Sequence, residues 1–294
     1  MSGVRETHEV HEVHEVHEVH EVHEVHEIHE IFDAEDDRLA AYRDLKDSAL
    51  RRSAELAGGV FVAEGKLALE AVLASPYPLR SVLALRRRLG ALDELNLPVS
   101  TPVYVVDEDV MASVTGFDVH RGLLGIAGRL PAIRPQDLLA RIASPLLLVV
   151  EGVNDQENLG AIFRNAAAFG VGAVFLDPTC SDPLYRRSVR VSLGHVLSVP
   201  FTRLEPWPGS LQLLREAGFE LLALTPAPGA ERIEVVSCDL QGSRVALIAG
   251  AEGRGLSPDV LAMCRRARVP MSPGVDSLNV AVATAVALHR FAAL

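Results

Sequence analysis

Residues 247–259 read Leu-Ile-Ala-Gly-Ala-Glu-Gly-Arg-Gly-Leu-Ser-Pro-Asp and predict a strand, a glycine-rich turn and the start of a helix. Ser257 is a favourable helix N-cap, and Pro258 fits the first helical position. Three glycines in the turn allow a positive φ or a close approach of the backbone to a ligand. They are Gly250, Gly253 and Gly255. Taken alone, such a turn suits a nucleotide-phosphate site and a plain tight turn equally well.

A second segment, residues 158–170, follows an apolar strand and a loop and reads Asn-Leu-Gly-Ala-Ile-Phe-Arg-Asn-Ala-Ala-Ala-Phe-Gly. In a helix over these residues, Ile162, Ala166 and Phe169 fall on one stripe. Arg164 lies roughly 160 to 220° away from that stripe at ~100° per residue. We therefore expect Arg164 to point away from the core. On this segment alone, an ordinary solvated arginine is the simpler interpretation.

A third segment, residues 269–285, reads Val-Pro-Met-Ser-Pro-Gly-Val-Asp-Ser-Leu-Asn-Val-Ala-Val-Ala-Thr-Ala. It predicts a loop that leads into a C-terminal helix, whose small side chains permit close packing. By itself, Ser277-Leu278-Asn279 is an ordinary helix cap, because a hydroxyl or an amide oxygen can accept hydrogen bonds from free backbone N–H groups.

In this order and spacing, the three segments resemble the signature motifs of the SpoU/TrmH family of RNA 2′-O-ribose methyltransferases, over residues 145–294. The resemblance implies an α/β fold in which the C-terminal parallel-sheet domain carries a trefoil knot of the SPOUT type, an exception to unknotted topology. It implies S-adenosylmethionine (S-adenosyl-L-methionine) as the methyl donor. It also implies a homodimer with the C-terminal helix in the interface, so that one site can draw residues from both subunits.

The resemblance carries site roles onto individual residues. The catalytic residues it implies are Asn158, Arg164, Glu252, Ser277 and Asn279. The methyl donor would contact Leu224, Gly250, Gly253, Gly255, Val269, Pro270, Met271, Ser277 and Leu278. Two positions depart from the usual motifs. Ala251 stands where several relatives have Asn or Ser, which indicates a subgroup, and Val269 stands where Ile is frequent.

Arg164 is an unusual base, because the high pKa of a guanidinium makes proton abstraction improbable unless a substrate phosphate or a neighbouring group assists. We therefore expect this side chain to orient the substrate and to stabilise charge. The reaction is an in-line displacement at a sulfonium methyl, so positioning of the reactants should supply much of the rate.

Apolar runs such as LLLVV and VALIA are typical of a parallel sheet that is covered on both faces. In the C-terminal half, strands are expected at 146–151, 173–176, 199–203, 220–224, 245–249 and 267–271. In the N-terminal half, a small α/β unit is expected, with strands at 60–62, 79–85 and 103–106 and a helix at 64–74.

The N-terminal module also resembles the ribosomal-protein-like substrate-binding domain that precedes the catalytic domain in bacterial rRNA members of the family. RNA is therefore the expected partner, 23S rRNA more than tRNA, with no DNA and no membrane. We expect a disordered tail over residues 1–34, a lead-in helix and the small domain over 35–130, a linker over 131–144 and the catalytic domain over 145–294.

The tail repeats His-Glu-Val or His-Glu-Ile eight times from His8 to Ile31, a period of three that matches neither a helix nor a strand. Such a tract buries too little apolar surface to offset its ordering entropy, which favours disorder. The alternative is weak metal chelation by the His8 to His29 repeat; no other metal site is expected. Beyond the tail, residues 35–56 predict an amphipathic lead-in helix with Leu39, Tyr42 and Leu45 on its apolar face.

The formal charge of −11 is concentrated in the tail, since residues 1–37 hold 13 acidic side chains and one basic side chain. The remainder has 26 acidic and 27 basic residues, so it can carry a local basic face. The candidate clusters are Arg51-Arg52, Arg86-Arg87-Arg88, Arg186-Arg187 and Arg265-Arg266. The N-terminus lacks a secretory signal and no apolar run reaches membrane-spanning length, so a cytoplasmic protein is expected.

The three cysteines lack CxxC spacing and are expected to be reduced, buried thiols rather than zinc ligands or disulfides. Three other functions stay open. One is a tRNA 2′-O-methyltransferase, the second is a catalytically silent RNA-binding protein of the same fold, and the third is a metal-handling protein whose tail is the working part.

Overall fold

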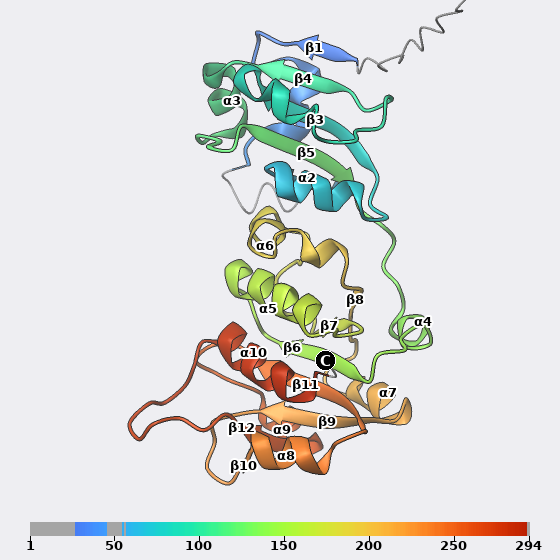
Figure 1. The fold of residues 1–294 in the computed structure, drawn as a ribbon, viewed down its shortest axis with the longest axis vertical. Coiled ribbons are helices and arrows are strands. Elements are labelled where there is room, and N and C mark those ends of the chain that lie inside the picture. The colour runs from blue at the N-terminus through green and yellow to red at the C-terminus, as the bar shows by residue number, and fades with distance from the viewer. Residues whose placement is uncertain (1–26, 46–54, 56, 293–294) are drawn as a thin grey trace, which may run out of the picture.

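The computed structural model describes residues 27–45, 55 and 57–292, and within these it contains two α/β domains stacked along the long axis of the molecule (Figure 1). Most of the His-Glu-Val tail therefore lies outside the described residues, and its predicted disorder and metal binding stay predictions. Among the described residues, no helix combines the length and the apolar character that crossing a bilayer requires.

The N-terminal domain is built on a five-stranded sheet with the order β1-β4-β3-β5-β2. Strands β1, β4 and β3 are parallel, and β5 runs antiparallel to both β3 and β2. The elements are β1 (Ile28–Glu30), η1 (Asp37–Tyr42), β2 (Val60–Glu64), α2 (Lys66–Leu73), β3 (Leu79–Leu85), η2 (Arg86–Ala91), β4 (Val103–Val106), α3 (Glu108–Thr115) and β5 (Leu123–Gly128).

The predicted strands at 79–85 and 103–106 are confirmed, whereas β5 was not identified from the sequence. The glycines of β5 obscure the strand pattern, yet packing requires one of them. A Cβ on Gly125 would lie 2.3 Å from Cδ2 of Leu69 on α2.

Two predictions for the N-terminal region are wrong. The disordered tail was expected to reach residue 34, but Ile28–Glu30 form β1 and pair with the open edge of β4, and Ile31 is buried. The lead-in segment is not a continuous α-helix, because η1 is a 3₁₀ helix that ends at Tyr42, and Asp44 then takes a φ of 54°. The spacing of three between its buried apolar residues suits a 3₁₀ turn. Residues 46–54 and 56 of that prediction lie outside the described residues.

The C-terminal domain contains a seven-stranded sheet in which all neighbouring strands are parallel, with the order β10-β12-β9-β11-β6-β7-β8. This confirms the α/β fold with a parallel sheet. The strands are β6 (Leu146–Glu151), β7 (Val174–Leu176), β8 (Phe201–Arg203), β9 (Phe219–Leu224), β10 (Glu231–Arg232), β11 (Arg244–Gly250) and β12 (Arg265–Arg268). The sequence pattern predicts no strand at the two-residue β10, and β12 begins two residues earlier than expected.

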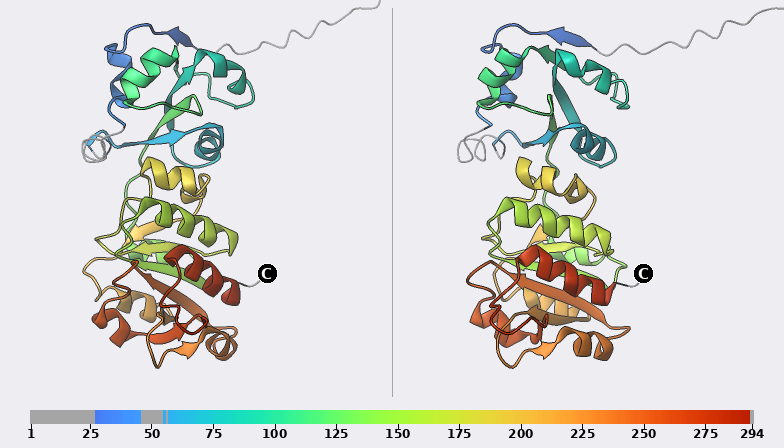
Figure 2. Two further views of the ribbon diagram at one scale, coloured as in Figure 1. Left: turned by 90° about the vertical axis from the view of Figure 1, so that its left-hand side faces the viewer. Right: turned by 60° about the vertical axis from the view of Figure 1, so that its left-hand side comes forward.

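Helices cover both faces of this sheet (Figure 2). The helices are α4 (Pro135–Leu139), α5 (Gln156–Ala168), α6 (Arg186–Val191), η3 (His195–Leu197), α7 (Leu211–Glu216), α8 (Ile233–Asp239), α9 (Pro258–Met263) and α10 (Val280–Phe291). Alternate residues of β6 face opposite layers: Leu148 packs in the core with α5, α8 and α10, and Val149 packs with α7 and α9. The continuous apolar strands are thus explained by burial on both sides.

The two domains are in direct contact through α6. Arg186 of α6 makes a 2.8 Å ion pair with the buried Glu64 of β2, and Arg129 makes a 2.7 Å ion pair with Asp182. Apolar residues of both domains join one buried cluster. The junction is therefore packed as well as ion-paired, which sets the relative position of the domains.

Candidate active site

The site lies where β6 and β11 end side by side. Glu151, the last residue of β6, is in register with Gly250, the last residue of β11. From β6 the chain continues outward to β7 and β8, whereas β9 and β12 lie on the other side of β11. In open parallel sheets, ligands bind outside the carboxyl ends of the strands where the strand order reverses. The topology alone therefore predicts a ligand site at the loops after β6 and β11.

The turn after β11 has a geometry that needs its glycines. Its ends form a bridge between Ala251 and Gly255, and Gly253 and Gly255 have φ values of 81° and 66°. A Cβ on Gly250 would lie 2.5 Å from the carbonyl carbon of Gly255, so the two backbones meet at a separation that no side chain allows. After the turn, Ser257 caps α9 by accepting from the Val260 N–H at 3.4 Å.

Residues from all three sequence segments meet at Asn279. Its Nδ2 donates to Glu252 Oε1 at 2.7 Å and to Asn158 Oδ1 at 2.8 Å. Its Oδ1 accepts from the Ala281 and Val282 N–H groups at 3.0 and 3.2 Å, which caps α10. One amide side chain therefore both begins the C-terminal helix and holds the carboxylate of the glycine-rich turn against the first turn of α5.

A cavity of about 490 Å³ opens between the glycine-rich turn and the loop before α10. Of the residues expected to contact the methyl donor, all except Pro270 line it: Leu224, Gly250, Gly253, Gly255, Val269, Met271, Ser277 and Leu278. Glu252 and Asn279 lie in the same wall. The volume falls within the range of small-molecule sites, roughly 300 to 1,000 Å³.

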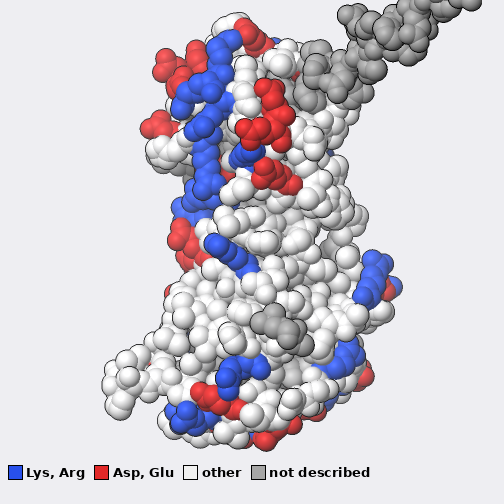
Figure 3. All heavy atoms as spheres, viewed as in Figure 1, with Lys and Arg blue, Asp and Glu red and all other residues white. Residues whose placement is uncertain are grey.

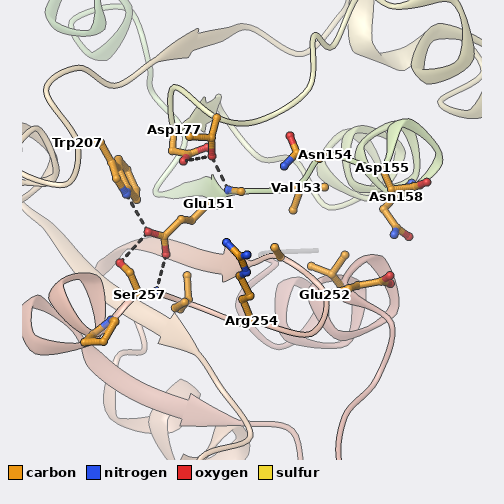
Figure 4. Close-up of a pocket in the computed structure, with 17 residues that line it drawn as sticks. Glu151, Val153, Asn154, Asp155, Asn158, Asp177, Trp207, Glu252, Arg254 and Ser257 are labelled. Carbon is orange, nitrogen blue, oxygen red and sulfur yellow. Dashed lines mark hydrogen bonds between the residues drawn. The ribbon is translucent and has the colours of Figure 1, made fainter. Parts of the chain in front are cut away.

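A second cavity of about 910 Å³ adjoins the first, and the two share Ala251, Glu252, Gly255 and Val280. Figure 4 shows the residues that line this second cavity. Its walls contain residues that the sequence analysis missed, among them Glu151, Asp177, Trp207 and Arg254. Glu151 and Asp177 could have been found from their places at the carboxyl ends of predicted strands. Trp207 follows β8 in a loop, and no local sequence signal points to it.

The carboxylates deep in the second cavity are satisfied by the protein itself. Glu151 accepts from Trp207 Nε1 at 2.8 Å, from Ser257 Oγ at 2.7 Å and from the Ser257 N–H at 2.8 Å.

Asp177 accepts from Thr179 Oγ1 at 2.6 Å, from the Gly152 N–H at 3.0 Å and from the Cys180 N–H at 2.9 Å. Burial raises the pKa of Asp177. The hydrogen bonds from Cys180, Thr179 and the Gly152 N–H lower it by more than burial raises it, so the pKa of Asp177 lies below its usual value.

Arg254 stands at the tip of the glycine-rich turn, and its guanidinium points into the second cavity between Glu151 and Glu252 (Figure 4). Within the part of the chain that the structure describes, no ion pair neutralises it. It is thus a positive charge available to a ligand at the boundary of the two cavities.

Arg164 is exposed on α5, as the helical spacing predicts, but it lies apart from the Asn279 cluster. It lines a different depression of about 460 Å³, beside His195 and Val171. The reason is helical geometry, since a residue six positions after Asn158 lies about 240° around the helix and ~9 Å along it. A single chain therefore brings Asn158, Glu252 and Asn279 together, with Ser277 in the adjoining wall, and does not bring Arg164 to them.

Metal ligands are not gathered anywhere in the described ranges, where no group of three or more His, Cys, Asp or Glu side chains converges. The cysteine prediction is wrong in part. Cys180 is buried and Cys264 is half-buried, but Cys238 is exposed on the outer side of α8, which covers the sheet with its other face.

The parallel sheet and the cavities at its switch point define an α/β protein with a site for small molecules. The chain has the fold of the AdoMet-bound rRNA methyltransferase from Sinorhizobium meliloti, with a TM-score of 0.75 and 23% identity over 90% of this chain and 97% of that one. It is also similar to a structure described as an RNA 2′-O ribose methyltransferase, with a TM-score of 0.69 and 25% identity over 90% of this chain and 98% of that one.

Sequence comparison identifies the family. Residues 145–289 match the model of the SpoU rRNA Methylase family. The "Uncharacterized tRNA/rRNA methyltransferase Rv0881" of Mycobacterium tuberculosis is 43% identical over 259 residues, which is 88% of this chain and 89% of that protein. The 23S rRNA (guanosine-2′-O-)-methyltransferase RlmB of Vibrio vulnificus is 36% identical over 155 residues, or 52% of this chain and 61% of that protein. The chain belongs to the SpoU methyltransferase family.

Proposed function

We propose that the chain transfers the methyl group of S-adenosylmethionine to a ribose 2′-hydroxyl of RNA, with 23S rRNA as the preferred substrate. The observation that carries this proposal is the Asn279 cluster, in which one amide joins Glu252 to Asn158 at the boundary between two cavities. A transfer between two substrates needs two adjoining cavities with oriented polar groups between them, because the donor and the acceptor must be held side by side in a fixed orientation.

The 490 Å³ cavity is suited to the methyl donor. Its walls are mostly backbone and apolar groups, and the glycines at 250, 253 and 255 let the main chain approach a flat ligand closely. Bound S-adenosylmethionine supplies a methyl group on a sulfonium centre. In this proposal, the main chain around Gly250, Val269 and Leu278 holds the adenosine, and Glu252, oriented by Asn279, faces the acceptor side.

The 910 Å³ cavity is suited to the acceptor nucleotide, because a ribose bound there would lie beside the wall that the two cavities share. Asn158 presents its side chain at this wall, and Arg254 offers a guanidinium. Such groups can orient a hydroxyl and stabilise the charge that develops as its proton leaves.

We further propose a homodimer in which Arg164 completes the site of the other copy. Helix α10 presents an apolar stripe to solvent, with Val282 51% and Val286 39% exposed, and α10 packs against α5, which carries Arg164. An apolar helix face of this kind is the expected core of an isologous interface. Substitutions that introduce charge, Val282→Glu with Val286→Glu, should give a monomer in sedimentation analysis and should abolish methyl transfer.

The roles of the domains follow the same proposal. Residues 35–130 would bind RNA, residues 131–144 would connect the domains, and residues 145–294 would form the catalytic domain with the trefoil knot of the family. The knot would involve the segment from β12 to α10, which also forms one wall of the donor cavity.

The preference for 23S rRNA rests on relatives, since RlmB of Vibrio vulnificus is named for guanosine 2′-O-methylation of 23S rRNA. The more similar mycobacterial relative is named for tRNA or rRNA alike, so a tRNA 2′-O-methyltransferase is the second candidate. A catalytically silent RNA-binding protein is the third, and the joined Asn158, Glu252 and Asn279 side chains speak against it.

The test is methyl transfer from S-[methyl-³H]adenosylmethionine to protein-free 23S rRNA and to bulk tRNA, followed by mapping of 2′-O-methylated positions. Label in 23S rRNA at a ribose would support the proposal, and label in tRNA alone would favour the second candidate. RNA binding without transfer, together with no calorimetric heat from S-adenosylmethionine at millimolar concentration, would leave the silent RNA-binding protein.

A further inference from the structure

The arginine triplet that begins η2 is divided by its partners. Arg86 makes a 2.5 Å ion pair with Glu30, and Arg87 makes a 2.6 Å ion pair with Glu108. Arg88 is exposed and has no acidic partner among the residues that the structure describes. Two of the three charges are thus already neutralised within the domain, and the third is free for an external anion.

A second free arginine lies beside the first. The side chain of Arg88 passes over Gly122, where an added Cβ would lie 2.9 Å from Arg88 Cγ. The preceding residue, Arg121, passes over Gly65 in the same way, with its Cδ 2.6 Å from a Cβ placed there. Arg121 is also exposed and has no ion pair within the described ranges. Glycines at 65 and 122 therefore let both side chains lie flat along the edge of the N-terminal domain.

Close to Arg121 in the chain, a cavity of about 390 Å³ lies at the domain junction. It is lined by Glu64, Phe117, Asp118, His120, Arg186, Arg187 and Arg190. Arg186 is committed to the junction, because it pairs with Glu64 at 2.8 Å and lies 4.3 Å from the centre of the Phe117 ring. Burial lowers the pKa of this guanidinium. Arg190 reaches the other oxygen of Glu64 only at 3.5 Å, so it retains donors for a ligand.

Arg187 extends the path to the candidate active site. Its side chain is 53% exposed and makes an ion pair with Glu157, the residue before Asn158, at 3.8 Å, a distance that leaves its N–H donors available to a ligand. The backbone fixes this proximity, because Ser188 Oγ donates to the Gln156 carbonyl at 3.0 Å and the two helices touch at Gly160. Figure 3 shows a band of Lys and Arg side chains down one side of the upper domain to the level of the junction, while the middle of this face is mostly uncharged and charges of both signs lie at its lower end.

We propose that Arg88, Arg121, Arg190 and Arg187, which we name the basic track, bind the sugar–phosphate backbone of the RNA substrate and direct it from the N-terminal domain to the acceptor cavity. The inference rests on the proposed RNA methyltransferase function and adds the route of the strand. Guanidinium groups suit this role because they contact phosphate oxygens through paired hydrogen bonds. Since the packed junction holds both parts of the track in place, little ordering is needed on binding.

The test compares two double variants with equal loss of charge. Arg88→Gln with Arg121→Gln removes half of the track, and Arg86→Gln with Arg87→Gln removes two neighbouring charges that are already paired. Binding of fluorescein-labelled fragments of protein-free 23S rRNA is measured by anisotropy at several salt concentrations. We expect the track variant to lose about tenfold in affinity and to reduce the log–log salt slope by ~0.7 to 0.9 per lost contact, while the control changes less than twofold.

Arg187→Gln tests the other end of the track and should lower both RNA affinity and the rate of methyl transfer at subsaturating RNA. Thermal melts and S-adenosylmethionine titrations should match the unsubstituted protein for all variants, which separates a lost contact from a folding defect. Equal losses in the track and control variants would overturn the proposal, because only net charge would then matter.

The outcomes distinguish this inference from the proposed function. An unsubstituted protein that methylates RNA, with track variants that bind and methylate normally, would reject the track alone. An unsubstituted protein that transfers no methyl group to any RNA would reject the proposed function, and the anisotropy measurement would still test the track. Binding of fluorescein-labelled polyglutamate is measured in parallel. Track variants that lose this binding while keeping their RNA affinity would reject the track and assign the surface to an acidic protein.

Discussion

Asn279 and Asn158 are joined by a hydrogen bond of 2.8 Å although 121 residues separate them in the chain. The same Nδ2 group donates its second hydrogen to Glu252, and the Oδ1 atom caps α10. The start of α5, the turn after β11 and the start of α10 are therefore held together by one side chain. Polar groups that are oriented in this way before a substrate arrives need little reorganisation during the reaction.

Asn279 should separate folding from activity when it is changed in two ways. Asn279→Ala removes the cap of α10 and should cost about 1 kcal/mol of stability, measured by thermal or denaturant unfolding. Asn279→Asp keeps a cap acceptor, so it should melt near the unsubstituted protein. It loses both donors and sets a carboxylate against Glu252, so it no longer orients that residue. Both variants should lose roughly 10²-fold in methyl transfer. Full activity of Asn279→Asp would show that the contact to Glu252 has no catalytic role.

Arg164→Ala should abolish methyl transfer while leaving folding and S-adenosylmethionine affinity nearly unchanged, because the side chain is exposed and lies outside the donor cavity. Arg164→Lys keeps the charge but loses the planar fork that can contact a phosphate and a hydroxyl together, so activity should stay orders of magnitude low. Single-turnover assays, thermal melts and donor titrations would measure these effects. Near-normal turnover of Arg164→Ala would show that Arg164 is a surface residue with no catalytic role.

Gly250→Ala should prevent the turn after β11 from closing, because the new Cβ would lie 2.5 Å from the backbone of Gly255. We expect more than tenfold weaker S-adenosylmethionine binding in calorimetry and a lower melting temperature. Gly90→Ala is the matched control, since no atom lies within 4 Å of a Cβ placed there. Equal donor affinity for both variants would mean that the close approach at residue 250 does not shape the donor cavity.

The three cysteines should differ in reactivity. Burial raises the pKa of the Cys180 thiol, as does its hydrogen bond to Asp177, and burial raises the pKa of Cys264 to about 11. Since the thiolate is the reactive form, only roughly a thousandth of the Cys264 thiol would be ionised near pH 8. Iodoacetamide at that pH should therefore modify the exposed Cys238 first, as read by peptide mass mapping. Early modification of Cys180 would show that the core around it opens.

Local pattern was enough for the central strands of the parallel sheet, because they carry their own evidence of burial, whereas the exposed two-residue β10 carries none. The apolar run at 146–151 is β6 in the structure, and its alternate residues face two helix layers. The helical period likewise placed Arg164 on the solvent side of α5, and glycine chemistry marked the turn after β11. Each of these features depends on interactions within a few residues or on burial of one face.

The composition of the site was decided by the tertiary structure. Trp207 contacts Glu151 across 56 residues, and Asn279 contacts Asn158 across 121, so no window of sequence contains either pair. The separation of Arg164 from Asn158, two residues of one motif, follows from their places around a helix that is fixed by its neighbours. A sequence sets which residues prefer burial and which can cap or turn; which strands become neighbours, and hence which side chains meet, depends on how the whole chain packs.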